Sequence, residues 1–483
     1  MGHSPFRSII AALLVFSLGH GAASLAATVS TDCETYLASQ GATQALAVFD
    51  PMSSGAQIAA RIRRRPFAGV QYRPVAVLSQ PREKFTPELF SSVHLEDFDP
   101  ADVVYFDGDL DKLQLELTAR GVVDGFIGTE TSVDLHAQMA QRMGFGGNAP
   151  ELTPVLRHKF LQGEHLRRRG IPVAEQILTG SFQELMAFAL TVGWPEKPLV
   201  IKPPDGAGGF LVTIDTDLQV LEAGFRAILA DKNPLNSEPF TQVLGMRYLP
   251  NQEGVADFVS MWDSLNDEIH IYATDYTFYK KTRFNGFTIY DEEEIMPFER
   301  AVEIGMEQYG MNVVRALPLR NGASHHEIKG NSLVETNGRL SGGGFPKFVE
   351  DVTGVNPIDV MIEAARDPQA FLARFSVPKT VRPNRIVYLR TLKSGTLVDL
   401  PHMDQIRKLP SFRGAKMVYA TEAEAKQAAA HGHAIRPTML VPTTNFLNYP
   451  GHIELVNDDR AQLEQDVKTV LELRDLPTFY TVK

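Results

Sequence analysis

Cysteine is almost absent from this sequence. Cys33 is the only cysteine among the 483 residues, which excludes an intrachain disulfide and a cysteine-rich metal site. A nucleophilic role for Cys33 would need a positioned base, and no residue near it in the sequence suggests one. Cysteine chemistry is therefore not expected to carry the function.

Basic residues are outnumbered by acidic ones, and long apolar runs are scarce. The net charge is -11 and the pI is near 5.7, which argues against a nucleic acid or an anionic membrane surface as a partner. Two short basic runs, 61–66 and 165–170, lie inside helical patterns. They are interpreted as solvated helix faces, with a basic groove as the alternative. No apolar stretch beyond residue 27 is long enough to predict stable insertion of the body into a membrane.

Residues 1–27 have the pattern of a secretory leader. Arg7 precedes the apolar run 9–18, and the small residues at 24–26 match a cleavage site. The alternative is a mis-assigned start that adds upstream codons.

Length and patterning predict three regions. In 42–150, strands alternate with helices, as in a small Rossmann-like parallel α/β domain. Residues 151–378 form a β-rich region with expected helices at 155–170, 217–229 and 298–309. A linker-like stretch at 378–383 precedes an α+β region, 384–483, that ends in a helix at 458–474.

The segment 332–345, SLVETNGRLSGGGF, places polar side chains at alternate positions. Glu335, Asn337 and Arg339 would share one strand face. With a three-residue hairpin loop at 330–332, Glu327 would pair with Glu335 on that face, whereas a two-residue loop would put the two on opposite faces. Two carboxylates and an amide oxygen suit Mg²⁺. The alternative is a solvent-facing polar hairpin.

Two lysines and a glycine-rich turn point to a phosphate group. The stretch LVIKPPDGAGGFLV, 199–212, delivers Lys202 from a strand into a glycine-rich turn, which offers a mobile charge and backbone donors. It is neither a P-loop nor a dinucleotide fingerprint, because the spacing is wrong and the turn leads into a strand. Lys159 lies on a helix face in LRHKFLQ. Alone it would be interpreted as a surface lysine, and only the other features suggest a role in the site.

Together these features resemble the ATP-grasp carboxylate–amine ligases, and within them the amino-acid (dipeptide) ligase branch. The resemblance runs from about Ala45 to the C-terminus. It is carried by DPMSSG, GTE with GGNAPEL, RHKFLQGEHLRRRGIPV, VIKPPDGAGG, YLPNQEGVADFVS, FYKKTRFNGFTIYD, NGASHHEI, VETNGRLSGGG and PGHIEL. It implies an α/β chain: an ATP-grasp fold preceded by the Rossmann-like domain and followed by a C-terminal α+β lid domain.

The resemblance also implies site residues. It assigns nucleotide binding to Lys159, Lys202, Gly206, Gly208, Gly209, Gly245, Met246, Tyr248, Leu249 and Glu253. It assigns metal binding to Glu327, Glu335 and Asn337. It places Arg339 and His325 at the acyl phosphate and the substrate carboxylate, as catalytic residues.

The implied reaction consumes ATP with Mg²⁺, or Mn²⁺. A carboxylate forms an acyl phosphate, and an amine then displaces phosphate, so the expected partners are amino acids and amines, with a homodimer possible. ATP chemistry favours the cytoplasm, whereas the leader favours export. The alternative function is a catalytically idle relative that binds nucleotide or peptide; the complete set of lysines and metal ligands favours the enzyme.

The sequence departs from the family pattern at three positions. Arg247 stands where an acidic residue is usual, Phe210 replaces a polar residue of the glycine loop, and His326 replaces a small residue before Glu327. None of these removes a lysine or a metal ligand.

Overall fold

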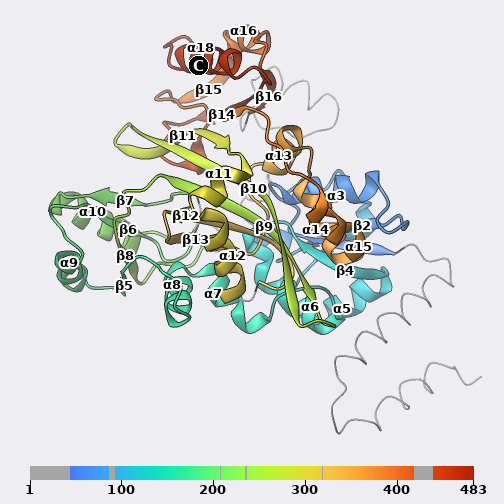
Figure 1. Cartoon of the computed structure of the whole chain (residues 1–483). Helices are drawn as coiled ribbons and strands as arrows, with labels where there is room; N and C mark the ends of the chain where they lie inside the picture. Colours follow the sequence, from blue (N-terminus) through green and yellow to red (C-terminus); the bar gives the residue numbers. More distant parts are fainter. Residues whose placement is uncertain (1–43, 86–92, 207, 234–236, 318, 418–438) are drawn as a thin grey trace, which may run out of the picture.

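The computed structural model describes residues 44–85, 93–206, 208–233, 237–317, 319–417 and 439–483 (Figure 1). The leader-like segment 1–27 and Cys33 lie outside the described residues. Within the described ranges, no helix has both the length and the apolar character needed to cross a bilayer.

The N-terminal region is a parallel α/β domain, as the alternation of strands and helices predicted. Its strands are β1 (Ala45–Phe49), β2 (Arg73–Leu78), β3 (Val103–Tyr105) and β4 (Val122–Ile127), in the order β3-β2-β1-β4. Its main helices are α3 (Gly55–Arg64), α5 (Leu110–Ala119) and α6 (Val133–Met143). Every residue of β1 is buried, which explains its continuous apolar run, because a parallel sheet is covered on both faces.

A second, antiparallel sheet carries the glycine-rich turn. It consists of β5 (Gln176–Thr179), β6 (Leu199–Lys202), β7 (Thr213–Asp215) and β8 (Val243–Arg247), in the order β5-β8-β6-β7. The helices α9 (Phe182–Thr191) and α10 (Leu218–Ala230) pack against it. Asp217 caps α10 as predicted, since its carboxylate accepts from the N–H groups of Gln219 and Val220.

The third sheet has eight antiparallel strands, in the order β13-β12-β9-β10-β11-β14-β18-β16. They are β13 (Leu333–Asn337), β12 (Gly322–Lys329), β9 (Glu253–Asp263), β10 (Glu268–Phe284), β11 (Phe287–Ile295), β14 (Asn384–Tyr388), β18 (Gly451–Val456) and β16 (Phe412–Met417). Glu292 of β11 pairs with Val387 of β14. One sheet therefore joins the two regions that the sequence analysis separated at 378–384.

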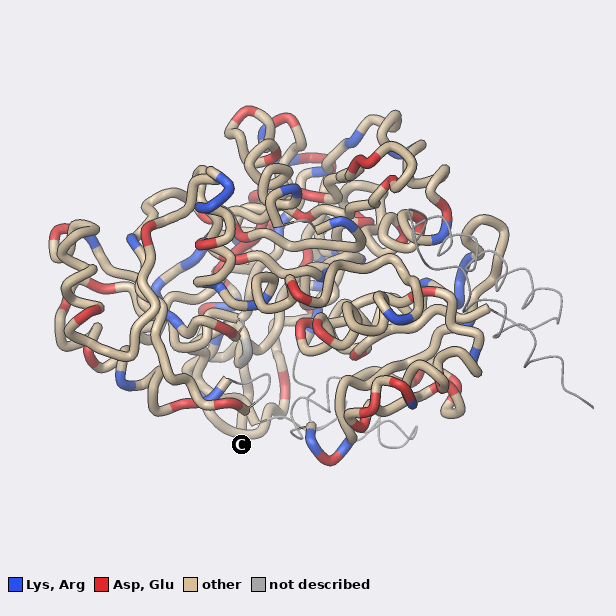
Figure 2. Tube along the Cα trace, turned by 90° about the horizontal axis from the view of Figure 1, so that it is seen from below, with Lys and Arg blue, Asp and Glu red and all other residues tan. Residues whose placement is uncertain are grey.

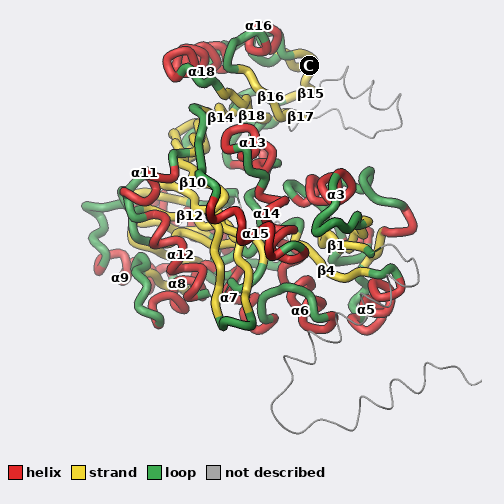
Figure 3. The backbone as a smooth tube through the Cα atoms, turned by 45° about the vertical axis from the view of Figure 1, so that its right-hand side comes forward, coloured by secondary structure: helices red, strands yellow, loops and turns green. Residues whose placement is uncertain are grey.

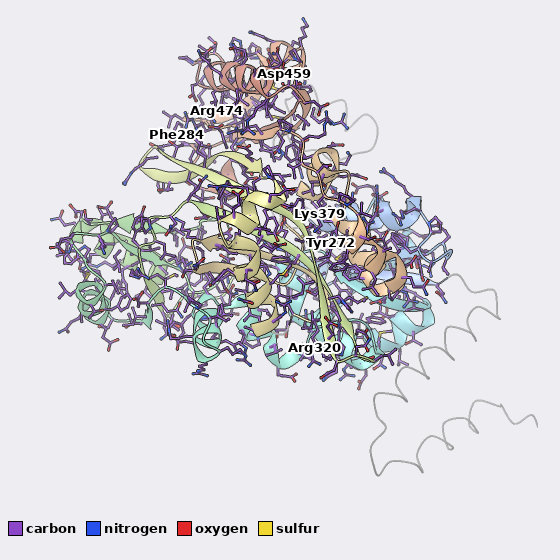
Figure 4. The ribbon with its side chains drawn as sticks, in the orientation of Figure 1. Tyr272, Phe284, Arg320, Lys379, Asp459 and Arg474 are labelled. Atoms are coloured by element: carbon purple, nitrogen blue, oxygen red, sulfur yellow. The ribbon has the colours of Figure 1, made fainter. Side chains whose placement is uncertain are left out.

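Smaller elements complete the C-terminal region, which stands at the top of Figure 1. They are β15 (Gly395–Asp399), β17 (Met439–Leu440), β19 (Thr481–Val482), α16 (Met403–Arg407) and α18 (Arg460–Arg474). Arg474 ties α18 to the large sheet, because its guanidinium lies 2.9 Å from Asp291 and donates to the Tyr388 carbonyl at 2.8 Å (Figure 4).

Two helices expected to be continuous are each divided. The segment 155–170 forms α7 (Thr153–Arg157) and α8 (Lys159–Arg168), separated by the extended residue His158. At this break the Lys159 N–H donates to the Pro204 carbonyl at 2.9 Å, so a contact with the glycine-rich turn replaces a helical hydrogen bond. The segment 298–309 divides at Gly305, between α11 (Phe298–Glu303) and α12 (Met306–Ala316).

One basic run is solvated only in part, because Arg63 and Arg64 are exposed but other arginines of the run are paired. The helices α13 (Phe345–Thr353), α14 (Pro357–Arg366) and α15 (Pro368–Ala373) follow the hairpin, and α14 lies against α3 (Figure 3). Arg61 of α3 and Arg65, which follows that helix, both bind the buried Asp359 carboxylate of α14, at 2.5 and 2.9 Å. This run thus holds the N-terminal domain onto the rest of the chain, because a buried carboxylate needs cationic partners. Elsewhere acidic and basic residues are interspersed (Figure 2).

The linker-like stretch is anchored to β10. The Lys379 ammonium donates to the Ala273 carbonyl at 2.7 Å and lies 3.9 Å from the ring centroid of Tyr272 (Figure 4). Burial lowers the pKa of Lys379 to about 8.

Candidate active site

The polar hairpin face forms as the sequence predicted. Across β12 and β13, Glu327 lies directly opposite Glu335, and His325 lies directly opposite Asn337. Directly paired residues of an antiparallel ladder project from the same face. The two carboxylates and the amide therefore point into one volume.

The turn of this hairpin is shorter than predicted. The Lys329 N–H donates to the Ser332 carbonyl at 2.9 Å, so residues 330 and 331 form the turn, and the predicted three-residue loop is wrong. A register shift places Val334 in a β-bulge, which restores the pairing of the carboxylates that a two-residue turn alone would separate. The Val334 carbonyl accepts a hydrogen bond from the Lys202 ammonium at 3.1 Å. The bulge thus fixes the position of this lysine as well.

The hairpin forms one wall of a cleft of about 160 Å³, the nucleotide-side cleft. The turn between β6 and β7, the end of β8, and strands β9 and β10 supply other walls. All predicted site residues except one line this cleft: Lys159, Lys202, Gly206, Gly208, Gly209, Met246, Tyr248, Leu249, Glu253, His325, Glu327, Glu335, Asn337 and Arg339.

The exception is Gly245, which is not among the residues that line the cleft. A Cβ there would lie 2.4 Å from Leu185 of α9 and 3.0 Å from Ile177 of β5. Close packing of helix on sheet accounts for this glycine.

Two of the departures from the family pattern are accommodated locally. Arg247 forms an ion pair with Glu175. His326 points to the opposite face of β12, where it is buried and its Nδ1 lies 2.7 Å from the Thr336 hydroxyl. Phe210 lines the cleft.

Lys159 and Lys202 converge on Glu335. The Lys159 ammonium lies 3.1 Å from the Glu335 carboxylate and donates to the Gly206 carbonyl at 2.7 Å. Burial alone would raise the pKa of Glu335, but the two ammonium groups lower it overall. Burial and the neighbouring Lys159 lower the pKa of Lys202 to about 8. A polyanion in this cleft would meet two buried cations.

Sequence reasoning missed a second pair of lysines in the cleft. The ammonium groups of Lys281 and Lys329 both bind the Glu253 carboxylate, Lys329 at 3.4 Å. Burial would raise the pKa of Glu253, and the two lysines lower it overall. The period of two from Glu327 to Lys329 could have revealed Lys329. Lys281 follows a register shift in β10, which no sequence pattern indicates.

The donor set on the hairpin fits a hard divalent cation. Glu327 and Glu335 lie side by side, and the Asn337 amide contacts Glu335 at 3.2 Å. Carboxylate and amide oxygens are the donors that Mg²⁺ prefers. Among the described residues, no three or more His, Cys, Asp or Glu side chains are grouped to hold a metal, so this set would use its amide and leave positions for other oxygens.

Arg339 and His325 are each held by a carboxylate that sequence reasoning did not assign. Arg339 pairs with Glu130 at 3.1 Å. His325 Nδ1 lies 2.8 Å from Asp257, whose other oxygen accepts from the Ser341 hydroxyl. Burial would lower the pKa of His325, but Asp257 raises it overall to about 10. An acidic residue inside the apolar run of β9 was the available indication of Asp257.

The glycine-rich turn has a backbone that requires glycine. Gly206, Gly208 and Gly209 have φ values of 119°, 68° and 73°, which side-chain-bearing residues rarely adopt. The Gly208 carbonyl accepts a hydrogen bond from the Phe446 N–H at 3.1 Å. The turn therefore touches the C-terminal region.

The glycine run at 342–344 is where three regions of the chain meet. The Gly343 N–H donates to the Ser53 hydroxyl at 2.8 Å, and Gln57 of α3 donates to the Gly344 carbonyl at 3.1 Å. From the C-terminal side, Lys416 of β16 donates to the Gly343 carbonyl at 2.6 Å.

A second cavity of about 290 Å³ adjoins the nucleotide-side cleft. The two share Gly208, Tyr290, His325, Glu327 and Arg339. Residues 52–54 and 128–130 of the N-terminal domain and the segment 340–343 line one side, and strands of the large sheet line another. A molecule in this cavity would lie beside the residues that the cavity shares with the cleft.

Comparisons with known proteins show similarity in sequence and in fold. The chain is 26% identical over 391 residues to dapdiamide A synthase of Enterobacter agglomerans, covering 77% of this chain and 83% of that protein. An L-amino acid ligase from Bacillus licheniformis has a similar structure, with a TM-score of 0.69, 14% identity, and coverage of 92% of this chain and 99% of that chain. A carboxyaminoimidazole ribonucleotide synthase from Aspergillus clavatus, complexed with ATP, gives a TM-score of 0.58, 13% identity, and coverage of 90% and 98%. No family model matches the chain.

Proposed function

We propose that this chain belongs to the ATP-grasp amino-acid ligases and uses ATP to join an amino acid to an amine through an acyl phosphate. The observation that carries the proposal is the convergence of Lys159 and Lys202 on the hairpin of Glu327, Glu335 and Asn337. A second cavity opens beside that point. This arrangement suits a nucleotide on one side and its phosphoryl acceptor on the other.

The cleft offers complementary contacts to each part of ATP. Val200, Met246 and Leu249 supply apolar surface for the base. Lys159 and Lys202 bind the phosphates, and the glycine-rich turn covers them. Mg²⁺, or Mn²⁺, bound by Glu327, Glu335 and Asn337 would neutralise phosphate charge.

The reaction follows in two balanced steps. An oxygen of the substrate carboxylate attacks the γ-phosphorus, and ADP leaves with the bonding electrons. The amine nitrogen, in its neutral form, then attacks the acyl carbon, the C–O bond to phosphate breaks, and phosphate leaves and takes up the proton that the nitrogen loses. Arg339 donates hydrogen bonds to the substrate oxygens, where loss of one such donor typically costs on the order of 3 kcal/mol. Asp257 keeps the His325 imidazole oriented beside them.

Phosphate release tests the function directly. The protein is incubated with ATP and Mg²⁺ and with pools of amino acids, first singly and then in pairs, and products are identified by mass. Phosphate released only with an amino-acid pool, together with a condensed product, supports the proposal. If no pool causes phosphate release although ATP still binds, the result would instead favour the catalytically idle relative.

Two expectations from the sequence remain proposals. N-terminal sequencing of the native protein would show whether 1–27 is removed as a leader, which would place the protein outside the cytoplasm. Sedimentation of the purified chain would show whether it forms the homodimer.

A further inference from the structure

One row of side chains crosses the large sheet beneath the second cavity. Tyr279 lies opposite Glu293, Glu293 opposite Ile386, and Ile386 opposite Glu454, on strands β10, β11, β14 and β18. All four line the cavity, as expected for directly paired residues that share a face. The cavity floor is therefore built by the sheet and includes two carboxylates.

Glu293 differs from its neighbours on β11. Glu292 and Glu294 project from the other face and pair with Arg385, both at 3.2 Å. Glu293 is buried, and its carboxylate accepts a hydrogen bond from the Tyr388 hydroxyl at 2.7 Å. Among the described residues, no lysine, arginine or histidine nitrogen lies within ion-pair distance of it.

A buried carboxylate without a cationic partner is costly unless it keeps its proton or meets a cation. Burial raises the pKa of Glu293 to about 7, as expected from its surroundings. Because Glu293 lines the second cavity, a cation in that cavity could reach its carboxylate.

The wall beside Glu293 is aromatic. Phe446 and Tyr449 stack with ring centroids 4.6 Å apart, and Tyr388 lies edge-on to both, at 5.8 and 5.4 Å. Tyr290 extends this wall, 5.5 Å from Phe446. Such a surface favours an aromatic or large apolar group and also attracts a cation.

Other residues that line the cavity have a different chemistry. Arg339 and His325 supply positive charge, and Ser53 and residues 342–343 line the cavity as well. A carboxylate suits Arg339 and His325, and an ammonium group suits Glu293. The two substrates of a carboxylate–amine ligase carry these two groups.

We propose that Glu293 binds the ammonium group of the amine substrate, whose aromatic or large apolar body lies against Tyr388, Phe446 and Tyr449. This inference rests on the proposed function for the identity of the second substrate. It names the substrate class as a primary amine or amino acid with a bulky apolar side chain.

Binding of an amine in the absence of ATP tests the site without turnover. Titration calorimetry compares L-phenylalaninamide with 3-phenylpropanamide, which lacks the amino group, and with glycinamide, which lacks the ring. The wild-type protein should bind L-phenylalaninamide at least about tenfold more tightly than either. If 3-phenylpropanamide binds as tightly as L-phenylalaninamide, the Glu293 carboxylate does not bind the ammonium group. If glycinamide binds as tightly, the site does not select an aromatic or large apolar substrate.

Two matched variants locate the effect. Glu293→Gln should lose the preference for L-phenylalaninamide over 3-phenylpropanamide, while Glu294→Gln, one residue away on the opposite face, should keep it. A thermal melt of each variant verifies that it is folded. If Glu293→Gln is folded and keeps the preference, the assignment is wrong.

Turnover separates this inference from the proposed function. With a productive amino-acid pair, Glu293→Gln should raise KM for the amine at least about tenfold and leave KM for ATP unchanged. Equal KM values in Glu293→Gln and Glu294→Gln would overturn the inference while the ligase activity stands. Wild-type silence with every pair would overturn the proposed function, and the calorimetry would still decide whether Glu293 binds an ammonium group.

Discussion

The nucleotide-side cleft and the second cavity share one sheet face but treat buried carboxylates in opposite ways. In the cleft, burial would raise the pKa values of Glu253 and Glu335, and two lysines beside each lower them overall. In the second cavity, burial raises the pKa of Glu293 to about 7, and a tyrosine hydroxyl is its hydrogen-bond partner. The first region neutralises its charges within the protein, and the second leaves one charge for a ligand.

This difference matches the charge of the groups that each region is proposed to bind. A triphosphate needs cations, and lysines can be kept in a buried cleft only beside carboxylates. An ammonium ion needs an anion, and Glu293 can accept it because no lysine or arginine of the described residues already does. The same sheet thus presents complementary charge at two adjacent places.

The largest expected effect is on turnover, through Glu335 in the cleft. Glu335→Ala removes a proposed metal ligand and the partner of Lys159. Phosphate release should fall by more than the roughly 100-fold seen when outer partners of a metal site are lost. Glu299→Ala, at an exposed position of α11, serves as the control. Full activity of Glu335→Ala would show that the metal site is assigned wrongly.

The next effect is on stability, again in the cleft. Glu253→Gln leaves Lys281 and Lys329 without their shared carboxylate. The protein should lose roughly 3 to 5 kcal/mol of stability, seen as a lower thermal midpoint. Glu268→Gln, exposed on β10, should leave the midpoint unchanged. If the Glu253→Gln protein is as stable as the wild type, the lysines and carboxylates of the cleft do not stabilise one another, and the proposed difference between the two regions is wrong.

In the second cavity, the corresponding substitution, Glu293→Gln, should raise the stability of the protein, and the size of the gain should depend on pH. The folded-state pKa of Glu293, about 7, lies above the ordinary value of 4.5. Its stabilising contribution is therefore complete below about pH 4.5 and is lost as the pH rises through 7. Glu293→Gln should be only slightly more stable than the wild type at pH 5 and more stable by roughly 3 kcal/mol at pH 8.

Thermal melts of Glu293→Gln and Glu294→Gln across this pH range check that expectation. The Glu294 carboxylate pairs with arginines, so its variant should show no gain at pH 8. Loss of stability in Glu293→Gln at pH 8 would mean that a cation of the protein already partners the carboxylate.

The smallest effect concerns the glycine run beside the second cavity. Gly344 and Gly354 flank α13 with φ values of 79° and 76°. An alanine Cβ at Gly344 would lie 2.7 Å from the Lys416 ammonium and 2.9 Å from the Gln57 amide, whereas nothing lies within 4 Å of one at Gly354. Each substitution should cost about 1 kcal/mol from backbone strain.

The difference between Gly344→Ala and Gly354→Ala then measures the contact among the three regions. Gly344→Ala should melt slightly lower, because Lys416 and Gln57 must move. Identical melting of the two variants would show that this contact contributes nothing to stability.

Much of the site was predictable because it follows from local patterns. The alternation of Glu335 and Asn337 required only the period of a strand, and the structure brings them together with Lys159 and Lys202. The partners of these residues were harder to find. Asp257, Glu130 and Lys281 approach the site from strands or loops far away in the sequence, so no spacing connects them to it.

By itself, the sequence determined the order of elements and the nature of the donors, since strand period, helix caps and glycine positions are local properties of the chain. Tertiary structure decided the register of the strands and which groups lie next to each charged side chain. The bulge at Val334 set the two carboxylates face to face, and the pairing of β11 with β14 placed Glu293 beneath an aromatic wall. Burial and long-range pairing fix the charge state of a buried group, and both arise only when distant strands meet.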